Sequence, residues 1–258
     1  MLSKQQKREF VDKGYLKVEG AVPQILVEAA RRAVNHSIGE VGLGGENLES
    51  NRSSYHCAEL CDQPVITDLY NGSPTMQILE SLMGEGNVQP IERAKPYPRF
   101  PLPVGEDASE PGGHIDGIGN GLNGTAKGDY NRGFTAFAVV YLVDVPEPYC
   151  GNFTVWPGSH RAMEAHFKEV GHDVLSNGMP RIELPEDPVM VTGKAGDVVI
   201  AHHALVHGAC QNASPNTRLA VIARPRHVNV KELGKDAYVD IWAEWPGVHE
   251  VLEETATT

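Results

Sequence analysis

The feature that most constrains the fold of this 258-residue chain is a change in the spacing of its apolar residues at about residue 88. Before that point, apolar residues recur at helical spacing. After it, short apolar runs are separated by prolines and glycines, and no long helical period survives. Several short runs with turn residues between them are typical of a β-sandwich or barrel. The sequence therefore predicts a mainly β protein with a helical N-terminal flank.

The flank carries recognisable helix ends. Ser3 followed by Gln6 is a capping box, Pro23 is suited to a first helical turn, and Gly84 is suited to a helix end. Residues 39–56, rich in glycine, asparagine and serine, are expected to form a loop. The expected elements are helices over about 4–13, 23–38 and 75–83 and a brief strand over 15–18.

The remainder of the chain is expected to supply the β core. β proteins of this length commonly fold as one domain. We therefore expect a single domain over 1–258, with a helical flank at 1–87, a β core at 88–228 and a C-terminal segment at 229–258. The apolar runs that predict strands are 134–145, 151–156, 189–192, 197–203 and 219–223.

The charge balance narrows the class of partner. A net charge of −12 repels phosphate backbones and anionic lipids on average, so neither nucleic acid nor a membrane is expected as a partner. The first twenty residues contain no apolar core of an export signal, and no apolar run approaches the length of a membrane span. A cytoplasmic location is expected, and the sequence does not indicate an oligomeric state.

His114 and Asp116 are the first candidate metal ligands. Residues two apart on an extended segment point to the same face, so the imidazole and the carboxylate can bind one ion. His207 is the preferred third ligand, and His202 and His203 are the alternatives. Two histidines and a carboxylate on one face of an octahedron leave three positions open, as iron(II) oxygenases require.

A His-x-Asp pair alone is weak evidence, because such pairs also occur in ordinary surface turns. Arg218 strengthens the interpretation. It opens the apolar run 219–223, and an arginine that points into a β core is costly unless an anion meets it. The guanidinium fork fits the distal carboxylate of a dicarboxylic acid such as 2-oxoglutarate.

Taken together, these motifs resemble the phytanoyl-CoA dioxygenase family over about residues 2–227. The combination of a Pro-Gly-Ser-His turn with a His-Gly…Asn…Arg string is fairly specific. The segments that carry the resemblance are Ser3-Lys-Gln-Gln, Phe10, Gly14-Tyr-Leu, His114-x-Asp116, Gly151-Asn-Phe-Thr-Val-Trp-Pro-Gly-Ser-His160, Gly196-Asp197, His207-Gly208, Asn212-Ala-Ser214 and Arg218.

The resemblance implies a double-stranded β-helix core, the jelly-roll fold of cupins, behind a helical flank. It also implies iron(II), O₂ and 2-oxoglutarate as cofactor and co-substrates, with His114, Asp116 and His207 as iron ligands and Arg218 as the 2-oxoglutarate anchor. The chain departs from many relatives at Ala209, where they carry a serine that can touch the co-substrate.

Further residues near these motifs have open roles. Thr135 is a candidate for a hydrogen bond to 2-oxoglutarate, and an ordinary strand threonine is the alternative. Arg93 and Lys95 alternate and can face either the pocket or solvent, with solvent expected for at least one. His160, in the Pro-Gly-Ser-His turn, is expected to be structural. The glycine-rich segment 117–133 is expected to be a lid over the substrate.

The expected function is the hydroxylation of a small organic molecule with release of succinate and CO₂. Desaturation, ring closure and epimerisation remain open, because substrate placement decides among them. One rival is a zinc or manganese hydrolase or isomerase on a cupin-like barrel, which has no need for Arg218. The other is a non-catalytic metal-binding cupin-like protein, which the complete set of ligands and Arg218 disfavours.

Overall fold

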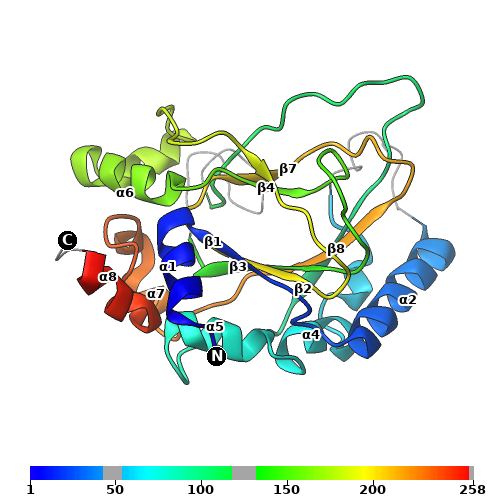
Figure 1. Ribbon diagram of the computed structural model, residues 1–258, viewed down its shortest axis with the longest axis horizontal. Coiled ribbons are helices and arrows are strands. Elements are labelled where there is room, and N and C mark those ends of the chain that lie inside the picture. The colour runs from blue at the N-terminus through cyan, green and yellow to red at the C-terminus, as the bar shows by residue number, and fades with distance from the viewer. Residues whose placement is uncertain (43–53, 118–131, 256–258) are drawn as a thin grey trace.

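The computed structural model describes residues 1–42, 54–117 and 132–255. In those residues, a five-stranded and a three-stranded antiparallel sheet lie one above the other, and helices cover the outer face of the larger sheet (Figure 1). The strands are β1 (Tyr15–Val18), β2 (Ala94–Arg99), β3 (Ala136–Tyr141), β4 (Phe153–Val155), β5 (Val189–Met190), β6 (Val198–His202), β7 (His207–Ala209) and β8 (Arg218–Ala223).

The helices gather mainly at the two ends of the chain. No helix in the described ranges is long and apolar enough to cross a membrane. The α-helices are α1 (Lys4–Lys13), α2 (Gln24–Val41), α4 (Pro64–Asn71), α5 (Thr75–Met83), α6 (Ser159–Val170), α7 (Val230–Leu233) and α8 (His249–Thr255). Short 3-10 helices are η1 (Ala58–Leu60), η2 (His172–Asn177), η3 (Gly234–Tyr238) and η4 (Pro246–Val248).

The predicted ends of α1 and α5 are confirmed, whereas α2 begins after Pro23 and continues to Val41, beyond the expected end at 38 and into the expected loop. The Ser3 hydroxyl accepts from the Gln6 amide at 3.3 Å, and the Gln6 side chain accepts from the Ser3 amide at 2.9 Å. This capping box starts α1, which ends at Gly14 with a φ of 78°. Gly84 ends α5 as expected. Local hydrogen bonds of this kind depend on a few neighbouring residues, so the sequence reveals them.

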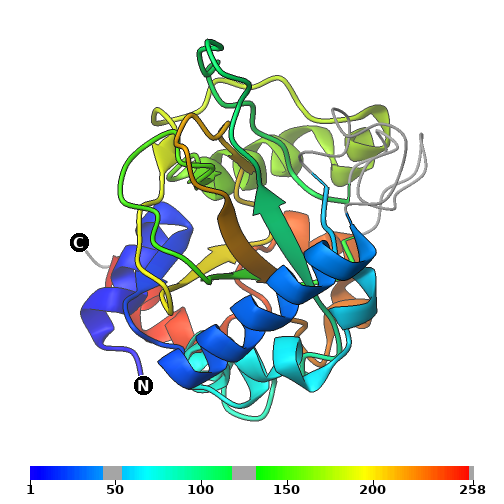
Figure 2. The ribbon, with the colours of Figure 1, turned by 90° about the vertical axis from the view of Figure 1, so that its right-hand side faces the viewer.

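The larger sheet has the order β1-β6-β3-β8-β2, and the smaller has the order β5-β4-β7. β3 shows how the two faces of the larger sheet differ. Ala136, Ala138 and Val140 pack with the helices of the flank, whereas Phe137 and Val139 belong to the apolar cluster shared with the smaller sheet. The period of two along each strand therefore separates an outer, helix-covered face from an inner face. Figure 2 shows α2, α4 and α5 against the outer face.

Among the elements that were not predicted from the sequence, β2 and α6 both lie beside prolines. β2 contains Pro96 and Pro98, which argue against a central strand, but β2 is the edge strand of its sheet, where a missing N–H is tolerated. The Pro-Gly-Ser-His turn is the start of α6, with Gly158 in a left-handed conformation (φ 74°) before it. Helices are thus not confined to the N-terminal flank.

The segment from Asp197 to His207 does not form one strand. β6 ends at His202, a turn follows, and His207 begins β7 in the other sheet. The chain therefore crosses between the sheets at this turn. His203 and His207 therefore do not share one face of a single strand.

A buried ion pair ties the segment before β3 to the C-terminal segment. Arg132 is 2% exposed and Glu244 is 1% exposed, and Arg132 donates to Glu244 at 2.7 Å. Arg132 also donates to the carbonyl oxygens of Gly234 at 2.9 Å and Val230 at 3.3 Å. The guanidinium thereby fixes residues 230–244 against the sheet.

Candidate functional site

The candidate site begins with an isolated β-bridge between His114 and His207. The His114 amide donates to the His207 carbonyl at 2.9 Å, and the His207 amide donates to the His114 carbonyl at 3.0 Å. Gly208 permits this approach, because a Cβ there would lie 2.4 Å from the Gly112 carbonyl oxygen. The backbone therefore brings together two residues, 114 and 207, that are 93 positions apart in the sequence.

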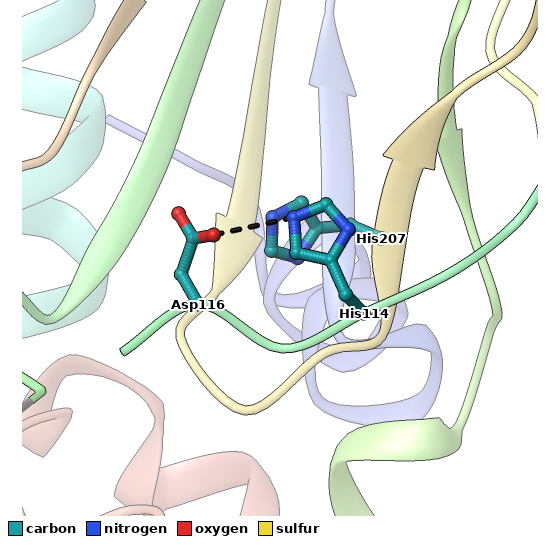
Figure 3. A group of neighbouring side chains, drawn as sticks. All are labelled: His114, Asp116 and His207. Atoms are coloured by element: carbon teal, nitrogen blue, oxygen red, sulfur yellow. Dashed lines mark ion pairs between the residues drawn. The ribbon is translucent and has the colours of Figure 1, made fainter. Parts of the chain in front are cut away.

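The side chains of His114, Asp116 and His207 converge on one point (Figure 3). Their potential ligand atoms all lie within 4.8 Å of one another. His114 Nε2 is 3.2 Å from an oxygen of Asp116, and the two imidazole centroids are 4.7 Å apart. The His114 side chain is 37% exposed and that of Asp116 only 4%, so the group opens to the surface at His114.

His207 is held in one orientation by its own turn. Its Nδ1 lies 2.9 Å from the Leu205 carbonyl oxygen, and since a carbonyl can only accept, Nδ1 carries the hydrogen. The lone pair is thus on Nε2, the nitrogen available to a metal. Burial, with the neighbouring His114, lowers the pKa of the His207 imidazole to about 4, so it is neutral at pH 7.

Asp116 is ionised despite its burial. Burial alone would raise the pKa of its carboxyl group. The hydrogen bond with His114 and the proximity of His207 and the Arg224 guanidinium oppose burial and hold that pKa well below its usual range. Two imidazoles and a carboxylate form a donor set that divalent iron accepts.

Arg224 is a site residue that the sequence did not reveal. It lies one position beyond β8, and its guanidinium forms an ion pair with Asp116. The guanidinium carbon lies 5.1 Å from the ring centroid of Phe134 and 5.9 Å from that of Phe137. An arginine just after a strand ordinarily indicates a solvated turn, so only its alternation with Arg218 along the inner face could have pointed to it.

Arg218 lies in the interior, as expected, at the first position of β8. It is 3% exposed, and it donates to the Gly151 carbonyl at 2.6 Å and to the Tyr97 carbonyl at 2.8 Å. Arg99 of β2 is its partner in the strand register. Burial and the charge of Arg99 lower the pKa of the Arg218 guanidinium. In the described part of the chain, no carboxylate pairs with Arg218, which leaves a buried cation suited to an anionic ligand.

The alternative histidines lie elsewhere. His202 and His203 are fully buried, and their Nε2 atoms lie 2.8 Å and 3.2 Å from the carbonyl oxygens of Ile241 and Ala237. His160 is also fully buried, with Nε2 at 3.1 Å from the Val11 carbonyl oxygen, which is a structural contact. All three histidines support the C-terminal segment or α1 rather than the cluster around Asp116.

Thr135 makes a structural contact. Its hydroxyl oxygen accepts from the His227 amide at 3.0 Å, and the side chain is fully buried. A bond from Thr135 to a co-substrate stays a prediction. Arg93 is exposed, whereas Lys95 is half-buried and faces the inner side of β2. The expected lid, 117–133, lies for the most part outside the described residues.

Comparison with known proteins finds a family match over part of the chain. Residues 129–220 match the model of the phytanoyl-CoA dioxygenase (PhyH) family, a segment that contains His207 and Arg218. No curated protein sequence matches the chain.

Solved structures share the fold over most of the chain. One is HygX from Streptomyces hygroscopicus with nickel, 2-oxoglutarate and hygromycin B bound, at 17% identity, 88% coverage of each chain and a TM-score of 0.58. A second is the non-heme monooxygenase ThoJ, at 17% identity, 86% coverage of this chain, 77% of that chain and a TM-score of 0.57.

A third is SnoK, a non-heme α-ketoglutarate-dependent carbocyclase of nogalamycin biosynthesis, at 22% identity and a TM-score of 0.51, covering 87% of this chain and 83% of that chain. At these identities the likeness concerns the fold, while the family match rests on the sequence of the core strands. Residues 129–220 thus match the phytanoyl-CoA dioxygenase family, as the motifs indicated, and the chain shares its fold with HygX, a protein solved with 2-oxoglutarate bound.

Proposed function

We propose that the protein uses iron(II), O₂ and 2-oxoglutarate to hydroxylate, or otherwise oxidise, a small organic molecule, with release of succinate and CO₂. The observation that carries this proposal is the convergence of His114, Asp116 and His207 beside a strand that also bears the buried Arg218. The proposal includes a single domain over 1–258, whose two sheets form a double-stranded β-helix.

His114, Asp116 and His207 are the proposed iron ligands. Their donor atoms are close enough for one ion to contact all three, and two imidazoles with one carboxylate leave positions for a keto acid and for O₂. When bound, iron supplies the oxidising chemistry that converts 2-oxoglutarate to succinate and CO₂ and oxidises the substrate. The open side at His114 is the side from which ligands would enter.

Arg218 is the proposed anchor for the distal carboxylate of 2-oxoglutarate. Its Nε and one terminal nitrogen are held by backbone carbonyls, which fixes the plane of the guanidinium. A fixed, desolvated fork binds a carboxylate more strongly than a mobile surface charge does. Arg218 would thereby orient the co-substrate while the keto acid end faces the three ligands.

The aromatic residues of the inner face would exclude water from the reaction. The Phe137 and Phe153 ring centroids lie 4.2 Å and 5.9 Å from that of His207, and both side chains are buried. An apolar wall beside the ligands favours reaction with bound substrate over reaction with solvent. Substrate placement against this wall would decide between hydroxylation and other oxidations.

The comparison structures support a small organic substrate. HygX is bound to hygromycin B, and SnoK is described as a carbocyclase. The same fold thus accommodates small-molecule ligands and an outcome other than hydroxylation. For this chain, hydroxylation is the proposed reaction, and desaturation, ring closure and epimerisation are the outcomes that product analysis has to distinguish.

Succinate formation tests the proposal. The protein is incubated with iron(II), ascorbate, 2-oxoglutarate and air, alone and with each member of a metabolite panel, and succinate is quantified. We expect iron-dependent succinate in the wild-type protein, stimulated by the true substrate, and none in His207→Ala. Iron binding without succinate under any condition would instead indicate a non-catalytic metal-binding protein.

A further inference from the structure

The inner faces of β2 and β8 carry positive charge at two separate places. In the strand register, Arg99 is paired with Arg218 at one end, and Lys95 is paired with Ile222 near the other. Arg224 follows just beyond β8, next to Asp116. One cation pair therefore lies at the Arg218 end, and Lys95 with Arg224 lies at the end beside the proposed iron ligands.

The two places lie at opposite ends of the strand pair. Six residues separate positions 218 and 224, which corresponds to about 20 Å between their Cα atoms along a strand. The single distal carboxylate of 2-oxoglutarate therefore meets one place and not the other. If 2-oxoglutarate spans from the metal to Arg218, its distal carboxylate leaves the pair of Lys95 and Arg224 without an anion.

Lys95 is a half-buried cation that lies over the ring of Tyr55. Its Nζ lies 4.6 Å from the ring centroid of Tyr55, and the backbone contact that places Tyr55 there is the His56 amide donating to the Pro96 carbonyl at 2.9 Å. Lys95 forms no ion pair within the described ranges. Burial, with the charges of Arg224 and Arg93, lowers the pKa of its ammonium group.

Arg224 has donors to spare. One terminal nitrogen meets Asp116, and no other hydrogen bond of its guanidinium is present among the residues that the structure describes. Phe134 and Phe137 hold the guanidinium from the side. Two restrained cations thus face the inner side of the sheet close to the proposed iron ligands, in a chain whose net charge is −12.

The charges do not cancel when the proposed ligands bind. Iron(II) and the 2-oxoglutarate dianion neutralise each other. Among the described residues, Asp116 forms an ion pair with Arg224, and no carboxylate forms an ion pair with Lys95 or Arg218. A site with a positive excess attracts and orients an anionic ligand.

We propose that Lys95 and Arg224 form a subsite for a carboxylate or phosphate group of the primary substrate. The subsite lies at the opposite end of the β2–β8 pair from Arg218. The inference rests on the proposed function, because it assigns the Arg218 end to 2-oxoglutarate. It narrows the substrate to an anionic small molecule whose acidic group lies beside the iron ligands and whose reacting carbon faces them.

Anion binding to the loaded protein tests the subsite. Protein reconstituted with iron(II) and saturating 2-oxoglutarate without oxygen is titrated calorimetrically with inorganic phosphate and, separately, with acetate. The anion that binds more tightly indicates whether the acidic group of the substrate is a phosphate or a carboxylate. Lys95→Met should weaken binding about tenfold or more, as expected for loss of one charged hydrogen bond. Arg224→Lys keeps the positive charge and should therefore retain most of the anion affinity.

Lys168→Met is the matched control, because it removes the same charge from the exposed surface of α6, where Lys168 pairs with Glu164. This variant should bind phosphate and acetate as the wild type does. The inference is overturned if the wild type binds neither anion, if Lys95→Met binds as the wild type does, or if binding depends on Arg218 instead.

The same sample separates this inference from the proposed function. Binding of 2-oxoglutarate to iron(II) is followed first, by its visible charge-transfer absorption. A sample that forms this complex but binds no anion rejects the subsite and keeps the proposed function. A sample that forms no complex rejects the proposed function and, with it, the assignment of the two ends.

Discussion

His114 and His207 are joined through their backbones by a reciprocal pair of hydrogen bonds of 2.9 and 3.0 Å, while their imidazole centroids lie 4.7 Å apart. The backbone contact does not depend on either side chain. It follows that the imidazoles can be removed without breaking the bridge that positions them, so metal binding and folding can be examined separately.

Replacing His114 by alanine should abolish iron binding with little effect on stability. The side chain is partly exposed, so its loss leaves no large cavity, but the metal loses one of three ligands. We expect iron affinity to fall on the order of 100-fold or more, with an unchanged unfolding midpoint in metal-free protein. Iron titration and thermal unfolding measure the two effects.

His203→Ala is the matched control and should behave in the opposite way. His203 is fully buried against the C-terminal segment, so its loss should lower stability while iron binding persists. Loss of iron from His203→Ala, together with retention in His207→Ala, would show that the wrong histidine was assigned.

Arg218→Lys should weaken 2-oxoglutarate binding. A lysine retains the charge but not the planar fork, and loss of a two-pronged carboxylate contact costs about 1–3 kcal/mol, or roughly 5- to 150-fold in affinity. The half-saturating 2-oxoglutarate concentration is measured against Arg161→Lys, a conservative change in the exposed pair with Asp12. An unchanged value in Arg218→Lys would reject Arg218 as the anchor.

Glu244→Gln should destabilise the fold strongly. The variant leaves the Arg132 guanidinium buried without its counter-charge, which costs about 3–5 kcal/mol in comparable cases. Replacing both residues, as Arg132→Met with Glu244→Leu, should recover much of the loss, because no buried charge remains. Denaturant unfolding of the single and double variants measures the coupling. Equal stability of Glu244→Gln and wild type would contradict a buried ion pair.

Stability should fall on acidification, in part through His160. Burial lowers the pKa of its imidazole to about 3, against about 6.5 in the unfolded chain, so the unfolded state binds more protons between these values. The contribution of His160 is complete above pH 6.5 and decreases as the pH falls. At pH 5 it is smaller by about 2 kcal/mol than at pH 8.

His160→Gln tests this contribution, since the amide can still donate to the Val11 carbonyl. Its free energy of unfolding should depend less on pH than that of the wild type, by about 2 kcal/mol between pH 8 and pH 5. His36→Gln, on the exposed side of α2, is the control. Identical pH profiles for His160→Gln and wild type would refute the assignment.

Sequence reasoning succeeded where structure is local and failed where it depends on distant partners. The ends of α1 are determined by Ser3, Gln6 and Gly14, which are neighbours in the chain. β2 is different, because Pro96 and Pro98 are acceptable only on a strand at the edge of a sheet, and strand order cannot be seen in the sequence.

The candidate site was predicted in the same uneven way. His114, Asp116 and His207 were found because a ligand set has a recognisable composition, and the structure brings the three together. Arg224 was missed because its role depends on a contact with Asp116 that lies 108 positions away. The turn after His202 was missed because it lies inside an apolar run.

The alternation of side chains along β8 has an evolutionary consequence. Leu219, Val221 and Ala223 pack with the helices, whereas Ala220 and Ile222 belong to the inner apolar cluster. Substitutions at the second set would alter the proposed ligand pocket without entering the helix-packed core. Substrate preference can therefore change through substitutions at alternate positions of one strand, while the intervening residues that pack with the helices stay the same.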